Sequence, residues 1–203
     1  MKNNVAGWIL FALALPAVIL GHLYVLLACL FWFAGWGTLR YQGAGVLTAR
    51  WRPWFSKRFR YSTTLGRGIC YGPGSYDASA AIDNRTEMHE FVHIKQFEDA
   101  CCQGLALGAL LMTLTLWWGW VTPVEGLGLW ALVWATSPAW NAVNNLTGAL
   151  RYGIKGLYRD AEHERSAYAQ TDVISQLKAD GNWTYESWTD LRDRARKTQQ
   201  GIG

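Results

Sequence analysis

Charged residues are scarce in this sequence. Only 17% of its 203 residues are charged, against 51% that are hydrophobic, and the chain contains 13 Trp. The apolar residues are clustered, which favours a membrane protein with polar parts over a soluble globular domain. The formal net charge of +4 is mild and no nucleic-acid-binding motif is present, so nucleic acid is not an expected partner.

Cysteine and histidine are also scarce, with four of each. The cysteines (Cys29, Cys70, Cys101 and Cys102) show no metal-ligand spacing, and a reducing compartment is the simpler interpretation. Four histidines are too few for a desaturase-type membrane site. Internal repeats and low-complexity segments are absent as well.

The N-terminal segment, residues 1–38, is predicted to lie in a membrane. Val5 to Trp36 carries no charge, and this length fits one long tilted helix or two short ones, with bends at Pro16 and at Gly21-His22. A single crossing would put the N-terminus outside, and two crossings would put it inside. The basic residues that follow, between Arg40 and Arg67, are typical of a cytoplasmic juxtamembrane loop.

A second apolar segment, residues 104–140, is predicted to be a transmembrane helical hairpin. Gly104 to Val121 and Leu127 to Trp140 are both apolar, and Thr122-Pro123-Val124-Glu125-Gly126 between them predicts a turn. Trp residues at both ends resemble an aromatic belt. Arg60 to Tyr71 predicts a short β-hairpin, which could be structural or could offer an edge to an extended peptide.

The strongest motif is His89-Glu90-Phe91-Val92-His93, a His-Glu-x-x-His sequence. On a helix, His89 and His93 lie one turn apart on the same face, where two neutral imidazoles can bind one Zn²⁺. The carboxylate of Glu90 can take a proton from metal-activated water. The helix is expected to begin near Asn84, with Glu87 completing a capping box, and to run to about Cys102.

A third protein ligand is needed for a catalytic zinc site. His22 lies in the first apolar segment and is expected to be structural or to lie at the lipid interface. The other candidates lie between Asp160 and Tyr168, on a predicted helix that runs to Leu177; a charged helix is expected from Glu186 to Gln199. A Glu in the predicted helix between Asp160 and Leu177 could approach the helix of His89 and His93 if the membrane hairpin returns the chain to the same side.

This arrangement resembles the gluzincins, and within them the HtpX-type (CAAX-prenyl-endopeptidase-like) membrane zinc metallopeptidases. That family has a transmembrane hairpin between His-Glu-x-x-His and a helical Glu followed by x-x-Ala-Asp. Glu164-Arg165-Ser166-Ala167 matches the Glu-x-x-Ala part, so the resemblance implies Glu164 as the third ligand, with Glu162 as the alternative. Tyr168 stands where the family has an Asp that supports a ligand His.

The resemblance implies a mainly α fold, with integral membrane helices and a small cytoplasmic zinc-metallopeptidase domain (residues 39–103 and 141–203) that carries the short β-hairpin. The implied activity is hydrolysis of peptide bonds in membrane-associated or misfolded proteins by zinc-activated water. One Zn²⁺ per chain is expected, held by His89, His93 and Glu164, with Glu90 as the base. The site would face the cytoplasm from a bacterial inner membrane. Candidates for stabilising the oxyanion or binding substrate are His163, Arg165 and Tyr168.

Two other hypotheses stay open at this point. A membrane di-iron carboxylate enzyme is suggested by Glu90-x-x-His93 and by the weaker Asp160-x-x-His163, but it also needs carboxylates from two further helices. Glu87 and Glu98 lie on the same helix as Glu90, which is poor geometry for that site. The third hypothesis is a non-catalytic zinc-binding membrane scaffold, suggested by Tyr168 in place of the family Asp.

Overall fold

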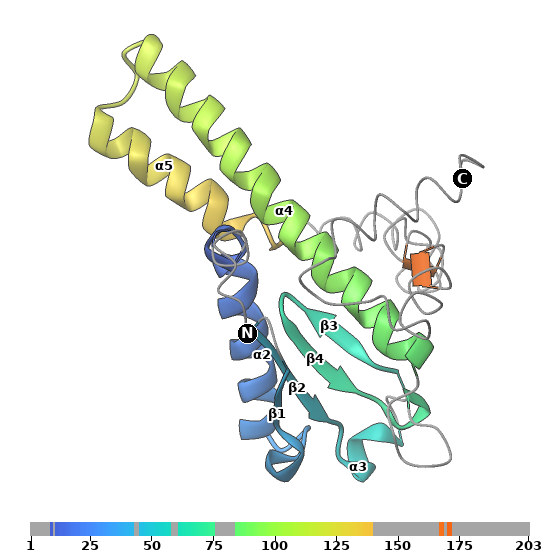
Figure 1. Ribbon diagram of the computed structural model, residues 1–203. Coiled ribbons are helices and arrows are strands. Elements are labelled where there is room, and N and C mark those ends of the chain that lie inside the picture. The colour runs from blue at the N-terminus through green and yellow to red at the C-terminus, as the bar shows by residue number, and fades with distance from the viewer. Residues whose placement is uncertain are drawn as a thin grey trace, which may run out of the picture.

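The computed structural model describes residues 9, 11–42, 45–57, 61–75, 84–139, 167–168 and 170–171. These residues are mainly helical, with one small mixed sheet of four strands. Figure 1 shows the sheet between two layers of helix, with a helical hairpin projecting away from it. In chain order the elements are α2 (Leu15–Leu30), η1 (Trp36–Thr38), β1 (Arg40–Gln42), β2 (Val46–Arg50), α3 (Pro53–Ser56), β3 (Thr63–Leu65), β4 (Gly68–Tyr71), η3 (Pro73–Ser75), α4 (Asn84–Trp117) and α5 (Pro123–Thr136).

The sheet has the strand order β1-β2-β4-β3. The predicted hairpin is confirmed, because β3 and β4 pair antiparallel with Thr64 opposite Ile69. The segment expected to be only a basic juxtamembrane loop instead supplies β1 and β2, and β2 pairs with β4 in parallel. The domain therefore carries a four-stranded sheet, of which the expected hairpin is one half.

Both faces of the sheet are covered, which explains why β4 is buried along its length and β2 at every residue except Arg50. Val46 and Ile69 belong to the core cluster with Met88 and Val92 of α4. Leu47, on the opposite face of the same strand, belongs to the cluster with α2. Successive side chains of a strand point to opposite faces, so these two strands each contribute to two cores. The result is an α2–sheet–α4 sandwich (Figure 1).

The N-terminal apolar segment forms α2, which lies along one face of the sheet. Pro16 stands in the first turn of α2, where its missing N–H costs nothing, and a turn at Ala14 separates α2 from a short helical stretch before it. The helix passes through Gly21 and His22 without a break. The Nδ1 of His22 lies 2.7 Å from the Val18 carbonyl oxygen, a structural role of the kind expected for this residue.

The zinc helix predicted from Asn84 continues well past Cys102. It forms one 34-residue helix, α4, that ends only at Trp117. The chain turns at residues 118–122, earlier than the predicted turn, and Pro123 to Gly126 instead form the first turn of α5, which starts with a capping box of Thr122 and Glu125. By length and composition Arg85–Trp117 could cross a bilayer, which is weak evidence for one membrane span. The N-terminal half of α4 thus belongs to the sheet domain and the C-terminal half to the hairpin.

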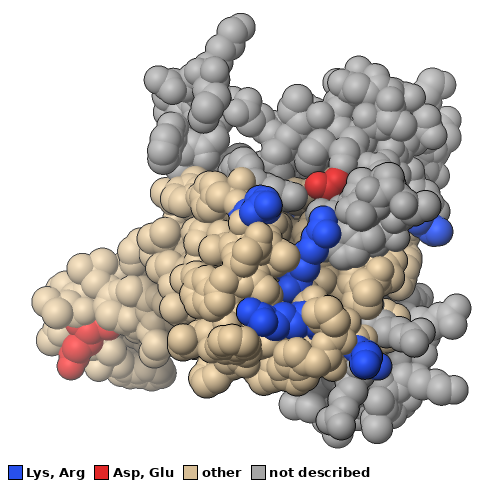
Figure 2. Space-filling view, turned by 90° about the horizontal axis from the view of Figure 1, so that it is seen from below, with Lys and Arg blue, Asp and Glu red and all other residues tan. Residues whose placement is uncertain are grey.

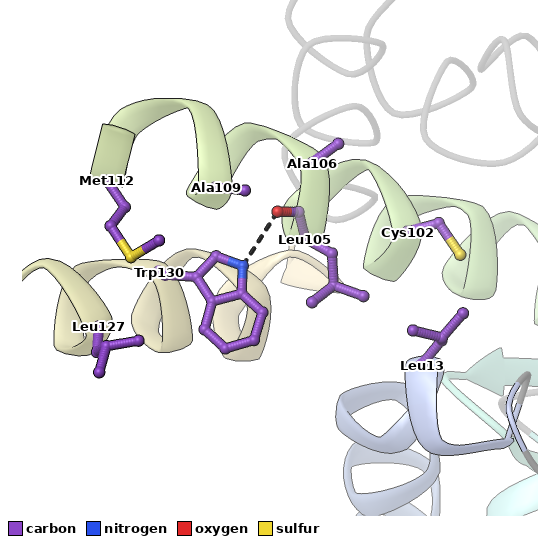
Figure 3. A pocket seen from close by; sticks show the side chains of 8 residues that line it. All are labelled: Leu13, Cys102, Leu105, Ala106, Ala109, Met112, Leu127 and Trp130. Carbon is purple, nitrogen blue, oxygen red and sulfur yellow. Dashed lines mark hydrogen bonds between the residues drawn. The ribbon is translucent and has the colours of Figure 1, made fainter. Parts of the chain in front are cut away.

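The hairpin has an open apolar groove of about 560 Å³ between α4, α5 and the start of α2. Figure 3 shows the side chains that line it, and the Trp130 indole donates to the Leu105 carbonyl oxygen at 3.1 Å. A second indole, Trp134, donates to the Leu13 carbonyl oxygen and so ties α5 to the start of α2. The groove lies on the hairpin and includes none of the predicted site residues.

Candidate metal centre

The sheet domain fixes the rotation of the N-terminal half of α4. Met88, Phe91, Val92 and Ile94 are buried in the core that α4 shares with the sheet. Because these residues anchor the helix on one side, His89 is left partly exposed. The hydrophobic spacing of the helix therefore decides where its polar side chains point.

The two histidines of the motif face each other, as the helical spacing predicts. Their Nε2 atoms lie 3.1 Å apart, and the ring planes meet at 88°. Two nitrogen ligands of a tetrahedral zinc ion, each at about 2.05 Å, stand about 3.3 Å apart. The pair His89 and His93 therefore already has the separation that one ion requires.

The far nitrogens of the two rings each face a side-chain oxygen. The Thr171 hydroxyl, which donates to the Ala167 carbonyl oxygen at 2.7 Å, lies 3.4 Å from the Nδ1 of His89. The Nδ1 of His93 lies 2.9 Å from the side-chain carbonyl oxygen of Gln96. In the tautomer with hydrogen on both Nδ1 atoms, the two Nε2 lone pairs face each other, and one cation could bind both.

Glu90 is buried, with 5% of its surface exposed, and its carboxylate faces the sheet. The Thr64 hydroxyl of strand β3 donates to Glu90 Oε2 at 2.5 Å. A hydrogen bond from a neutral donor holds the carboxylate in one orientation while leaving it able to accept a proton. Since β3 is an edge strand, this contact also places Glu90 beside an edge of the sheet.

A segment more than seventy residues downstream reaches the histidines. The Tyr168 ring packs on His89, with ring centroids 4.5 Å apart, and Ala167 is fully buried in the core shared by α4 and the sheet. The Ala of the Glu-x-x-Ala sequence therefore lies against the zinc helix. In place of the Asp that the family would have at Tyr168, the hydroxyl of Thr171 faces the Nδ1 of His89.

The described residues bring together two of the expected zinc ligands and the expected base. They contain no group of three His, Cys, Asp or Glu that could hold a metal. The proposed third ligand Glu164, its alternative Glu162, and the candidates His163 and Arg165 lie outside the described residues, as do Asp160 and the predicted C-terminal helices.

Three residues of the site were not predicted from the sequence: Thr64, Gln96 and Thr171. Gln96 follows His93 by three residues, a helical spacing that could have suggested the contact. Thr171 follows Glu164 by seven, the distance of two helical turns. Nothing local in the sequence indicates Thr64, because its partner lies on a different element 26 residues away.

Glu98, on the same helix as Glu90, pairs with the buried Arg67 at 2.7 Å. The four cysteines form no disulfide, and burial raises the pKa of the Cys70 thiol to about 12. Comparison with known protein families, characterised proteins and solved structures finds no match for the chain.

Proposed function

We propose that the chain is a membrane-attached zinc endopeptidase of gluzincin type, which hydrolyses peptide bonds of membrane-associated or misfolded proteins at the cytoplasmic face of a bacterial inner membrane. The observation that carries the proposal is the separation of 3.1 Å between the Nε2 atoms of His89 and His93. A pair of histidines with both outer nitrogens hydrogen-bonded is the arrangement in which imidazoles bind metal. One Zn²⁺ per chain would satisfy it.

Glu164 is proposed as the third ligand and Glu162 as its alternative. Ala167 and Thr171 both face the zinc helix, and Glu164 precedes them by three and seven residues, the spacings at which side chains share one face of a helix. The contact of Tyr168 with His89 supports this register, because Tyr168 follows Glu164 by four residues.

When bound, zinc would lower the pKa of water and polarise the carbonyl of the scissile bond. Glu90 would take the proton from the attacking water and pass it to the leaving amine. Thr64 would hold the Glu90 carboxylate in place for both transfers, and the adjoining edge of β3 would align an extended peptide. Tyr168, beside His89, is the described candidate for stabilising the oxyanion, with His163 and Arg165 as further candidates.

The membrane part of the proposal rests on the hairpin and on the basic segment before the site. The outer side chains of the hairpin are apolar and exposed, among them Leu110, Leu127 and Leu132. Its tip carries three exposed tryptophans, Trp117, Trp118 and Trp120, the residue type enriched at bilayer interfaces. Each arm is short for a full span, since the 14 residues of α5 extend about 21 Å.

The first test is the metal content of detergent-purified protein, wild type beside Glu164→Ala and Glu90→Gln. We expect about one zinc per chain in the wild type, a large loss in Glu164→Ala, and retention in Glu90→Gln. Zinc retained in Glu164→Ala would move the third ligand to Glu162, and two irons per chain would contradict the proposal.

Cleavage of β-casein, followed in the same preparations, tests the chemistry separately. Wild-type protein should cleave it and Glu90→Gln should not, although it holds zinc, because the proton acceptor is removed. A zinc-loaded wild type that cleaves no protein substrate, casein or membrane protein, would instead support a scaffold.

A further inference from the structure

The outer face of α2 is an apolar stripe that no described part of the chain covers. Leu15, Ile19, Leu23, Leu27 and Leu30 recur at helical spacing, and their exposed fractions run from 38% to 60%. Isolated exposed leucines are common, but a continuous stripe along a helix marks a contact surface. The stripe is as long as the helix itself, about 24 Å for 16 residues.

The inner face of α2 is already occupied. Val25 and Ala28 pack into the core with β2 and β4, and Gly21 touches the backbone at Gly68. A helix with a sheet packed along one side cannot be surrounded by lipid. A helix that crossed the bilayer here would also draw the polar edge of the sheet toward the hydrocarbon, where unpaired backbone groups are costly.

Exposed aromatic rings continue the stripe beyond the C-terminal end of α2. Phe31, Trp32, Trp36 and Trp54 are 48–62% exposed. Trp32 adopts a left-handed backbone conformation, with φ of 63°, that L residues rarely take. The Trp54 indole donates to the Trp32 carbonyl oxygen at 3.2 Å, which holds the two rings at the surface.

Positive charge surrounds these rings without any negative charge nearby in the sequence. Arg40, Arg50 and Lys57 are exposed beside them, and the Arg52 guanidinium lies over the Trp32 ring at 4.4 Å. The first acidic residue of the chain is Asp77. Figure 2, which views the molecule from this end, shows basic side chains running across the face. The combination of an apolar stripe, an aromatic rim and positive charge matches an anionic lipid surface.

We propose that α2 lies in the plane of an anionic bilayer, with its outer stripe among the acyl chains and its arginine–aromatic rim at the headgroups. This deepens the membrane attachment of the proposed function and is independent of the zinc chemistry. The hairpin projects toward the side of the sheet on which α2 lies (Figure 1), so both could contact the same bilayer. The histidine pair lies on the other side of the sheet. We therefore expect the bond that is cleaved to lie in a part of the substrate that is exposed to water.

Nucleic acid also binds positive surfaces, but its phosphates do not bind an apolar stripe about 24 Å long. A bilayer can bury the apolar stripe and attract the positive charge. A second copy of the chain could cover the stripe, yet it would bring a second set of basic residues to the same rim. An anionic bilayer is the partner that matches both features at once.

The test places spin labels on α2 in full-length protein reconstituted in nanodiscs that contain phosphatidylglycerol. Single cysteines at Leu15, Ile19, Leu23 and Leu30, in a Cys102→Ser background, are labelled one at a time. Depth is read from the relative collision rates with oxygen and with a water-soluble nickel chelate. We expect a nearly constant depth of about 5–10 Å below the phosphates for all four labels. A label at Arg85, on α4, should be in water.

Each alternative gives a different pattern. A depth that passes through a maximum at Ile19 or Leu23 would mean that α2 crosses the bilayer. Free access to the nickel chelate would mean a solvated stripe, and low access to both reagents with spin–spin broadening would mean a second copy. Any of these overturns the proposal. The Glu90→Gln variant should give the same depths, so a failure of the catalytic proposal would not be confused with a failure here.

The charge of the rim is tested by lipid exchange. In nanodiscs of phosphatidylcholine alone the labels should move toward the water, and Arg40→Gln with Arg50→Gln should abolish the difference between the two lipids. Arg85→Gln, which removes an exposed arginine from α4, should leave the difference intact. Equal depths in both lipids for the wild type would contradict the role of the rim.

Discussion

The proton positions on two imidazole rings decide what the centre of this molecule can bind. The Nδ1 of His89 faces the Thr171 hydroxyl and that of His93 faces the Gln96 side-chain oxygen; with hydrogen on both Nδ1 atoms, the facing Nε2 atoms would be able to bind one ion. The same rings with hydrogen on Nε2 could not share an ion. At this scale the zinc proposal rests on two side-chain oxygens that are not themselves ligands.

Replacing Thr171 by Val should weaken zinc binding. The hydroxyl that orients His89 would be lost while the shape of the side chain is kept, and loss of such a partner typically costs 10–100-fold in metal affinity. Zinc affinity measured by competition with a chelator checks the result. Thr171→Ser, which keeps the hydroxyl, should bind nearly as the wild type does. Equal affinity in Thr171→Val would show that Thr171 does not orient His89.

Thr64 should affect turnover and leave metal binding alone. Thr64→Val removes the donor to the Glu90 carboxylate, so kcat for casein cleavage should fall about 10–100-fold, the usual cost of losing a hydrogen-bond partner at a metal site. Thr64→Ser should restore most of the rate, and the zinc content should match the wild type in both variants. If Thr64 only stabilises the fold, Thr64→Val should lower the Tm together with kcat. A fall in kcat with an unchanged Tm supports the proposed role.

At the scale of elements, α2 can approach the β3–β4 turn closely because glycines, which have no side chain, lie at the contact. A Cβ on Gly21 would lie 2.3 Å from the backbone nitrogen of Gly68, and the Arg67 backbone nitrogen donates to the Ala17 carbonyl oxygen at 2.9 Å. The buried Arg67 then reaches Glu98 on α4. One turn therefore ties together both helical layers and the sheet.

Gly21→Ala should destabilise the fold by about 1–3 kcal/mol, because backbone rather than a flexible side chain would have to move. Gly128→Ala is the matched control, since it lies in α5 with nothing within 4 Å of its added Cβ. That substitution should be neutral or stabilising by up to about 1 kcal/mol. Denaturant unfolding in detergent, followed by circular dichroism, measures both. Similar effects for the two variants would contradict the close approach of α2 to the turn.

At the scale of the whole molecule, zinc would join parts of the chain that are far apart in sequence. The histidines lie on α4, whereas Tyr168 and Thr171 follow the hairpin. An ion that binds only when these segments are together stabilises the folded state by mass action, about 2.7 kcal/mol at a free concentration of one hundred times Kd.

Removing zinc with EDTA should therefore lower Tm by several degrees, and added zinc should restore it. His93→Ala should show a low Tm that does not respond to either reagent, because it lacks one ligand. Thermal unfolding in the same detergent with and without chelator makes the comparison. A wild-type Tm that is the same with EDTA and with added zinc would contradict a structural link between α4 and the downstream segment.

Several elements could be predicted because their signals are local. The helix that carries His89 and His93 and the β3–β4 hairpin each depend on residues within a few positions of one another. The same holds for the spacing that places the two histidines on one face. Helical and hairpin periodicities are short-range, so the sequence shows them directly.

The sequence by itself determined that His89 and His93 share one face of a helix beside Glu90, and that an apolar hairpin follows. Only the tertiary structure decided that the basic loop supplies β1 and β2, that α2 is a layer of the sheet domain, and that Thr64 and Thr171 contact Glu90 and His89. Each of these depends on pairing between distant residues, such as Thr48 with Ile69 or Thr171 with His89. A non-local contact leaves no periodic trace in the sequence, because it is selected by the packing of whole elements rather than by spacing along the chain.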